Sequence, residues 1–447
     1  MNKQITIVGA GLVGSLLSIY LAKKGYKINV YERRADMRKV NMSAGKSINL
    51  ALSDRGWRGL EGVGIADEIK KIAIPMYGRY IHNKDGSSTV QPYGKDNQAI
   101  YSVSRADINM KLMDLAEKQA NVTFHFDKKC TNVNRTSLES TFEDNNTQQL
   151  TKVKSDLIFG ADGAFAASRL NLQLSSDRFE YNQHYIDCGY KELIIPPGKN
   201  GEFLMEKNAL HIWPRGSFMM IALPNPDGNF TCTLFMPFTG EKSFEKLKTK
   251  EQITAFFNEE FADAVSLMPT LIEDFITNPT ASLVTVKCFP WTFDNKIALI
   301  GDAAHAIVPF YGQGMNCCFE DCVVLNELVE KHKDNWDAIM VDYQNLRKPD
   351  GDAIADLAIA NFVEMRDKTA DPKFLLQKKI EAKFSLKHPD KWIPLYSMVT
   401  YSPHIRYSTA LIEGKKQQAI MDKIMEMPNI NSIWESEEVE NKILSSL

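Results

Sequence analysis

The chain has 447 residues, of which 44% are hydrophobic and 24% are charged, and its formal net charge is -3. A balance this close to neutral implies no nucleic-acid partner and no polybasic membrane partner. No uncharged apolar run approaches the roughly 18 residues of a membrane span, and no secretory signal precedes the first predicted strand.

Residues 4–33 are predicted to form a strand, a glycine turn, a helix and a second strand. Gly9, Gly11 and Gly14 fit the pattern G-x-G-x-x-G, in which glycines permit a tight turn and let a pyrophosphate lie on helix N-terminal amides. Glu32 ends the second strand, where a carboxylate accepts hydrogen bonds from a ribose hydroxyl. The combination predicts a dinucleotide site without distinguishing NAD from FAD.

After residue 33, the first half of the chain contains a clear helix N-cap and a polar segment. Ser104 is a suitable N-cap for a helix that begins at Arg105. The polar segment 137–154 is expected as a surface hairpin or loop, whereas 156–160 resumes a buried strand. The turn after that strand, residues 161–169, suits a cofactor contact and a simple capped helix equally well.

Strand signals dominate from about Tyr181 to Pro290, where the turn Pro-Asp-Gly-Asn separates two apolar runs. A second, antiparallel sheet is therefore expected in this part of the chain. From Met315 to the end the pattern is mainly helical, with breaks at several prolines.

The segment IGDAAHAIVPFYGQGMN, residues 300–316, follows a predicted strand and indicates which dinucleotide is bound. Asp302 lies at the carboxyl end of that strand, where a second polyol contact suits the ribityl chain of FAD better than NAD. Gly312 and Gly314 let the backbone approach a flavin ring, and a helix beginning near Met315 directs its amides at the charge of a reduced flavin.

These elements predict an α/β fold with a Rossmann-type FAD-binding domain, an antiparallel-sheet substrate domain and a C-terminal helical region. We expect the first two domains to be assembled from separate segments. The expected segments are 1–72, 104–180 and 291–340 for the FAD-binding domain, 73–103 and 181–290 for the substrate domain, and 341–447 for the helical region.

Three segments, GAGLVG with Glu32, ADGAFAASR and GDAAHAIVPFYGQG, resemble in this order the FAD-dependent aromatic hydroxylases of the para-hydroxybenzoate hydroxylase type. SINLALSDRGW, YGRYIH with QPYG, SVSRADIN, FYGQGMNCCFEDC, ANFVEMR and IPLYSMVTYS are similar to the kynurenine-hydroxylating members, from about Lys3 to about Leu411. The resemblance implies that NADPH reduces FAD, that O2 forms a flavin C4a-hydroperoxide, and that L-kynurenine becomes 3-hydroxy-L-kynurenine. NADPH is expected to visit transiently, because no second strand-linked glycine motif occurs.

The same resemblance implies a set of site residues. Arg79 and Tyr93 correspond to the pair that binds the carboxylate of L-kynurenine, and a guanidinium with a phenol suits that group. Asn361 and Tyr396 correspond to two further substrate contacts. The expected cofactor contacts are Gly9, Gly11, Gly14, Glu32, Arg33, Arg105, Asp302, Gly312, Gly314, Met315 and Asn316.

Two alternatives remain open for the function: a related flavin monooxygenase acting on a different aromatic substrate, and a flavoprotein that binds a ligand without turnover. No side chain is assigned as a general acid or base, because the amino group of L-kynurenine itself activates the ring. His305 is expected either near the flavin or in a structural turn.

No metal site is expected, because Cys317, Cys318 and Cys322 share one helix without a second pair at ligand spacing. The seven cysteines have no framework spacing and are expected as reduced thiols. Eukaryotic members of the family carry a hydrophobic C-terminal anchor, whereas this chain ends in a charged segment. We therefore expect a soluble, cytoplasmic, bacterial-type protein.

Overall fold

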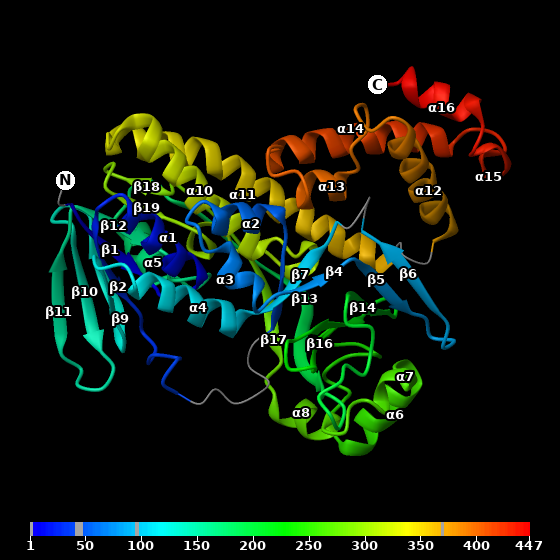
Figure 1. Cartoon of the computed structure of the whole chain (residues 1–447), viewed down its shortest axis with the longest axis horizontal. Coiled ribbons are helices and arrows are strands. Elements are labelled where there is room, and N and C mark those ends of the chain that lie inside the picture. The colour runs from blue at the N-terminus through cyan, green and yellow to red at the C-terminus, as the bar shows by residue number, and fades with distance from the viewer. Residues whose placement is uncertain (1–2, 41–47, 94–97, 368–370) are drawn as a thin grey trace.

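The computed structural model describes residues 3–40, 48–93, 98–367 and 371–447, with the backbone alone described at 365–367. Ser47 and Gly94, which belong to two segments that carry the family resemblance, lie outside these ranges. The described residues form two sheet-based lobes and a C-terminal group of helices, and the two chain ends lie far apart (Figure 1).

The first lobe is built on a six-stranded sheet in the order β18–β19–β12–β1–β2–β8. All neighbours pair in parallel except the edge strand β18. Its strands are β1 (Gln4–Val8), β2 (Lys27–Tyr31), β8 (Val122–His125), β12 (Leu157–Gly160), β18 (Thr292–Phe293) and β19 (Ile297–Leu299). The predicted Rossmann-type domain is thus confirmed.

Helix α1 (Leu12–Lys23) connects β1 to β2 and packs against α4 (Arg105–Glu117) and α10 (Gly314–His332). Ser104 caps α4 as predicted, because its side chain accepts a hydrogen bond from the amide of Asp107 at 3.3 Å. The shorter helices of this lobe are α2 (Asp54–Glu61), α3 (Ala66–Lys70), α5 (Ala167–Leu174) and α9 (Asp302–His305).

Two small antiparallel sheets flank the six-stranded one. The order β3–β7–β4 joins β3 (Asn49–Leu52), β7 (Ile100–Ser104) and β4 (Ile74–Met76). The order β11–β10–β9 joins β11 (Leu150–Lys154), β10 (Glu139–Asp144) and β9 (Lys128–Asn134). The segment expected as a hairpin or loop is therefore the hairpin β10–β11.

The second lobe is a seven-stranded sheet in the order β17–β13–β16–β15–β14–β5–β6. Only β14 and β5 pair in parallel, and the other neighbours are antiparallel, as predicted for a substrate domain. Its strands are β5 (Gly78–His82), β6 (Ser88–Pro92), β13 (Glu180–Ile195), β14 (Ala209–Pro214), β15 (Met219–Pro224), β16 (Phe230–Met236) and β17 (Ala281–Phe289).

Strands do not fill the whole region 181–290, where strand signals were expected to dominate. Helices α6 (Lys250–Glu260), α7 (Ala262–Val265) and α8 (Leu271–Thr277) occupy part of it and lie on the side of the sheet away from the C-terminal helices (Figure 1). The signals of α6 are a capping box at Thr249 and buried apolar residues at helical spacing, which pack onto the sheet.

The C-terminal part is helical, as predicted. Helix α11 (Trp336–Asp367) runs from the first lobe toward the C-terminal group, so the boundary expected at 340/341 falls inside it (Figure 1). The group consists of α12 (Pro372–Lys387), α13 (Leu395–Thr400), α14 (Tyr407–Met425), α15 (Ile430–Ile433) and α16 (Glu437–Leu444). Among the described helices, none has both the length and the apolar character to cross a membrane.

Candidate active site

The glycine turn after β1 has one position where the backbone is tightly packed and one where a side chain would meet open space. A Cβ on Gly14 would lie 2.0 Å from the carbonyl oxygen of Gly9, so only glycine lets α1 start this close to the strand. A Cβ on Gly11 would meet no protein atom within 4 Å. The turn therefore leaves a cradle beside the N-terminal amides of α1, which fits a pyrophosphate.

Glu32 is held at this turn by two backbone amides. Its carboxylate accepts hydrogen bonds from the N–H of Ala10 at 2.9 Å and of Arg34 at 3.0 Å. A carboxylate has about four acceptor positions, so two remain for ribose hydroxyls. Arg33 lies exposed directly beside it.

Asp302 lies at the same edge of the six-stranded sheet, at the start of α9. The preceding Gly301 has φ +65°, and a Cβ there would lie 2.8 Å from a methyl carbon of Val13 in α1. The turns after β1 and β19 thus contact each other, and the chain brings Asp302 to the side of the glycine turn. One cofactor that reaches from one turn to the other matches this arrangement.

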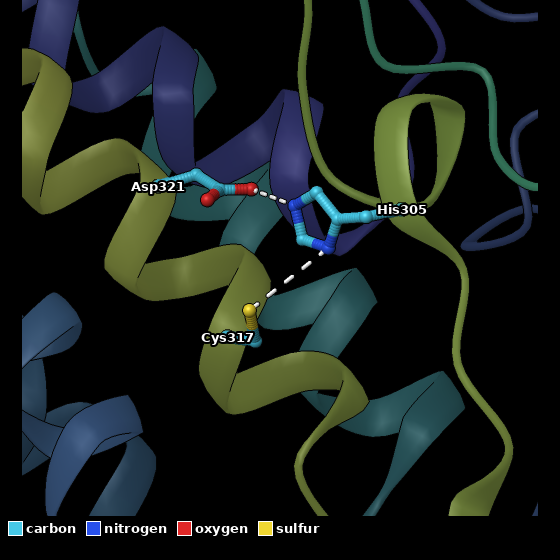
Figure 2. A group of neighbouring side chains, drawn as sticks. All are labelled: His305, Cys317 and Asp321. Atoms are coloured by element: carbon cyan, nitrogen blue, oxygen red, sulfur yellow. Dashed lines mark hydrogen bonds and ion pairs between the residues drawn. The ribbon is translucent and has the colours of Figure 1, made fainter. Parts of the chain in front are cut away.

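A buried cluster of charged side chains is bonded to the turn that carries Asp302, and Figure 2 shows two of its members, His305 and Asp321. Asp321 on α10 accepts hydrogen bonds from the N–H of Gly301 at 3.1 Å, from Nε2 of His305 at 2.6 Å and from Nε of Arg347 at 2.7 Å. Burial opposes the charged imidazole, but the Asp321 carboxylate outweighs this effect and raises the pKa of His305 well above its usual range. His305 therefore has a structural role in this turn.

The geometry of the cluster does not suit a metal ion. The two ring nitrogens of His305 point in different directions, Nε2 to Asp321 and Nδ1 to the Cys317 sulfur at 3.9 Å (Figure 2). Arg347 also donates to Asp321 and, at 3.4 Å, to the Cys317 sulfur. A guanidinium thus already supplies the positive charge that a metal would bring.

The turn before α10 is fixed to β3 by one side chain. The Asn316 amide donates to the carbonyls of Ala51 and Gly312, both at 2.8 Å, and its oxygen accepts from the N–H of Ser53 at 2.9 Å. These bonds occupy the Asn316 side chain, so a cofactor contact from this residue would use its backbone N–H. Gly312 has φ +65° and Gly314 begins α10, followed by the buried Met315.

The segment 161–169 is a capped helix start that also braces α9. Asp162 accepts hydrogen bonds from the N–H and hydroxyl of Ser168, at 2.9 and 2.5 Å. Arg169 is buried and donates to the carbonyl of Ala303 at 2.8 Å. Arg105 is exposed at the first position of α4.

Arg79 and three tyrosines meet at the edge of the seven-stranded sheet. The Arg79 guanidinium lies 5.4 Å from the ring centroid of Tyr93 and 5.0 Å from that of Tyr396. Tyr396 stacks on Tyr93 and on Tyr311, in each case with 5.8 Å between centroids. Strand β5, the segment after β6, the turn before α10 and α13 thus place these residues together.

This cluster is suited to an anion carried on an aromatic molecule. The hydroxyl of Tyr93 is buried beside the Arg79 and Tyr396 side chains, and within the described part of the chain it makes no hydrogen bond of good geometry. Burial raises the pKa of Tyr93, so its hydroxyl stays protonated and can donate. A guanidinium and a phenol donor in a half-buried aromatic surround match a carboxylate beside an aromatic ring.

Asn361 on α11 lies near the same cluster but contacts the cofactor turn. Its side-chain amide donates to the carbonyl of Phe310 at 2.8 Å. The Phe310 ring in turn packs on Phe362, at 4.3 Å between centroids, and on Phe235, at 5.1 Å. The Asn361 side chain thus connects α11 to the turn before α10.

Sequence reasoning missed two residues of this region. Tyr401 is buried, and its ring lies 6.1 Å from that of Tyr396. Arg55 is fully buried and contacts the segment around α13. Both lie in segments that carry the family resemblance, which was the available signal, but neither has a distinctive local spacing.

Comparison with known proteins gives one family model, described as FAD binding domain, which matches residues 2–358. A protein of Flavobacterium johnsoniae named kynurenine 3-monooxygenase is 52% identical over 444 residues, covering 99% of this chain and 98% of that protein. A protein of the same name from Dictyostelium discoideum is 46% identical, covering 95% and 94%.

Two solved structures share the fold at low identity. The tetrameric form of 2-methyl-3-hydroxypyridine-5-carboxylic acid oxygenase is 20% identical, with a TM-score of 0.67 over 83% of this chain and 94% of the other. PqsL of P. aeruginosa, in complex with 2-aminobenzoylacetate, is 17% identical, with a TM-score of 0.65 over 82% and 97%.

Proposed function

The chain belongs to the kynurenine 3-monooxygenase family, and from this premise we propose that it hydroxylates L-kynurenine to 3-hydroxy-L-kynurenine. FAD is the cofactor, and NADPH and O2 are the co-substrates. The observation that carries the proposal is the meeting of Arg79 with Tyr93 and Tyr396, because it supplies a cation and phenol groups in an aromatic surround. L-kynurenine has the matching groups, a carboxylate on a short chain and an aromatic ring.

When bound, FAD supplies the redox chemistry by which electrons from NADPH activate O2. The chain would hold it with the cradle at Gly11, with Glu32 on a ribose and with Asp302 on the ribityl chain. The α10 N-terminus would direct its amides at the negative charge of the reduced ring. Arg33, Arg105, Gly312, Gly314, Met315 and Asn316 complete the proposed cofactor contacts.

The substrate residues have a positioning task rather than an acid–base task. Arg79 and Tyr93 would fix the carboxylate, and Tyr396 and Asn361 would complete the site from the C-terminal helices. The stacked tyrosines would shield the aromatic ring of the substrate from water on one side. No general acid or base is assigned, since the aniline nitrogen of the substrate activates the carbon that is attacked.

The test is NADPH oxidation by the FAD-loaded protein with and without L-kynurenine, with 3-hydroxykynurenine and hydrogen peroxide counted together. We expect strong stimulation and hydroxylated product equal to the NADPH consumed. The matched control is 2-aminoacetophenone, which keeps the ring but lacks the carboxylate and should neither bind well nor stimulate. Stimulation that yields only peroxide would favour a related monooxygenase with another substrate, and no stimulation would favour a flavoprotein without turnover.

We also propose a cytoplasmic location. All seven cysteines are buried and none forms a disulfide, which supports a reducing compartment. Cell fractionation with an antibody against the protein tests this.

A further inference from the structure

The side chain of Arg55, on α2, donates hydrogen bonds to several separate parts of the fold. Its side chain is fully buried, and Nη1 pairs with the carboxylate of Glu320 on α10 at 2.6 Å. Nε donates to the carbonyl of Val399 at 2.7 Å, and Nη2 donates to that of Met398 at 3.1 Å. One guanidinium therefore connects the FAD-binding domain to α13.

The carbonyls that Arg55 reaches belong to the end of α13 and to the turn after it. The last four carbonyls of a helix have no partner within the helix, and a cation near them is favourable. Arg55 satisfies two of these on α13 and also donates to the carbonyls of Ser402 and Ile405 before α14. The position of α13 relative to the first lobe thus depends on this side chain.

Tyr396 stands at the opposite end of the same six-residue helix. Its ring is stacked on Tyr93 and lies 5.0 Å from the Arg79 guanidinium. The hydrogen bonds of the Arg55 side chain go to Glu320 and to four carbonyls in and after α13, and not to Arg79, Tyr93 or Tyr396. Its most direct route to the carboxylate site is therefore through the position of α13, which carries the Tyr396 ring.

The same guanidinium is linked to the turn before α10. It lies 3.9 Å from the ring centroid of Tyr407, whose hydroxyl donates to the Gln313 side chain at 2.9 Å. Gln313 is buried between Gly312 and Gly314. Arg55 therefore bonds to the end of α13 and, through Tyr407, is linked to the turn before α10.

We propose that Arg55 is a positioning residue that holds the Tyr396 ring in the substrate site by capping α13. This inference rests on the proposed function, because it takes L-kynurenine as the ligand of that site. A lysine at position 55 keeps the charge but loses the planar fork, so it cannot serve Glu320 and four carbonyls together. The α13 helix then loses its fixed position while the charge balance of the core is kept.

The test is a double-mutant cycle with Arg55→Lys and Tyr396→Ala in the FAD-loaded protein. Alanine removes the ring whose position Arg55 is proposed to set. The readout is the Kd for L-kynurenine, measured by the change in flavin absorbance on titration. We expect Arg55→Lys to raise this Kd about tenfold or more in the wild-type background and less than about twofold in the Tyr396→Ala background. The amount of bound FAD should be unchanged, and KM should rise more than kcat falls. Arg58→Lys is the matched control, since Arg58 lies one turn along α2 and, among the described residues, its side chain bonds to the Pro403 carbonyl and Glu327.

An unchanged Kd in Arg55→Lys with full FAD content would overturn the proposal, and so would an effect that simply adds to that of Tyr396→Ala. If wild-type protein shows no flavin response to L-kynurenine, the proposed function itself is wrong. If Arg55→Lys does not fold, Glu320→Gln takes its place in the cycle, because Glu320 holds the guanidinium from α10. The same non-additive pattern is then expected.

Discussion

The Arg79 guanidinium lies 5.0 Å from the ring centroid of Tyr396, although one residue is on strand β5 and the other on helix α13. The site that we propose for the substrate carboxylate is therefore completed by the C-terminal helices. A cation over an aromatic face gains stability when both are desolvated, so ligand binding and the docking of α13 are expected to support each other.

Arg79→Ala should weaken L-kynurenine binding by about 30-fold or more, because a charged hydrogen-bonding partner contributes about 2 kcal/mol or more. FAD should stay bound, since Arg79 lies on the seven-stranded sheet and not at the glycine turn. Titration of the flavin absorbance with L-kynurenine measures this. Tyr80→Phe is the control, because among the described residues the Tyr80 hydroxyl bonds to the exposed Ser88 at 3.0 Å. Equal affinities for wild type and Arg79→Ala would rule out this carboxylate site.

Alanine substitutions at Gly11 and Gly14 should differ in effect: the first should weaken FAD binding, and the second should lower the stability of the fold. Gly11→Ala places a methyl group in open space, so the apoprotein should keep its Tm while the affinity for FAD falls at least tenfold. Gly14→Ala places a methyl group 2.0 Å from the Gly9 carbonyl oxygen, so the apoprotein itself should lose stability. Calorimetry of both apoproteins and FAD titration give the answer. A Gly11→Ala protein that binds FAD normally would show that the cradle is not the pyrophosphate site.

Asp321→Asn should lower the free energy of unfolding by about 3 kcal/mol or more, because His305 loses its buried counter-charge and Arg347 keeps only its pairs with Glu320 and Asp350 among the described residues. Burial disfavours the carboxylate, but His305 and Arg347 keep the pKa of Asp321 below its usual value. Urea unfolding of the FAD-loaded protein measures the loss. Asp356→Asn, which removes a partly exposed pair with Lys287, should change it by less than about 1 kcal/mol. Similar losses in the two variants would contradict the buried-network account.

His211 should make the protein less stable as the pH falls. Burial lowers the pKa of His211 to about 4, from 6.5 for an ordinary histidine, and its neighbours are His82 and the carbonyl of Glu206. Between these values the unfolded chain binds a proton that the folded chain does not, so stability falls with the pH in this window by up to about 3 kcal/mol. His211→Gln should flatten this part of the profile, measured by urea unfolding at a series of pH values. An unchanged slope would show that other groups cause it.

Local patterns predicted the parts of the fold that depend on local interactions. The turn from β1 to α1 and the Ser104 cap could be read directly, because their glycines and hydroxyl act within a few residues. Helices α6 to α8 were not predicted, because the expectation for residues 181–290 was based on strand signals in other parts of that region. The roles of Arg55 and Asp321 could not be predicted, since their partners lie on other elements, beyond the range of a local pattern, and only folding brings them close.

The family resemblance supplied Arg79, Tyr93 and Tyr396, which no spacing rule connects, and the structure brings these three together. It could not supply what each side chain does with its hydrogen bonds. Asn316 illustrates this, because its amide is engaged by Ala51, Gly312 and Ser53. Which hydrogen bonds a side chain makes depends on atomic positions in the fold rather than on residue type.

Strands β5 and β6 join a sheet whose other five strands come from residues 180–289, through the parallel pairing of β5 with β14. The strand that carries Arg79 is thus encoded apart from the rest of its sheet. Recombination that exchanged residues 180–289 as a block would replace most of the substrate lobe and leave Arg79 behind. Such an exchange would therefore change the walls of the lobe around an unchanged Arg79, so the proposed carboxylate contact would stay the same while the rest of the site varied.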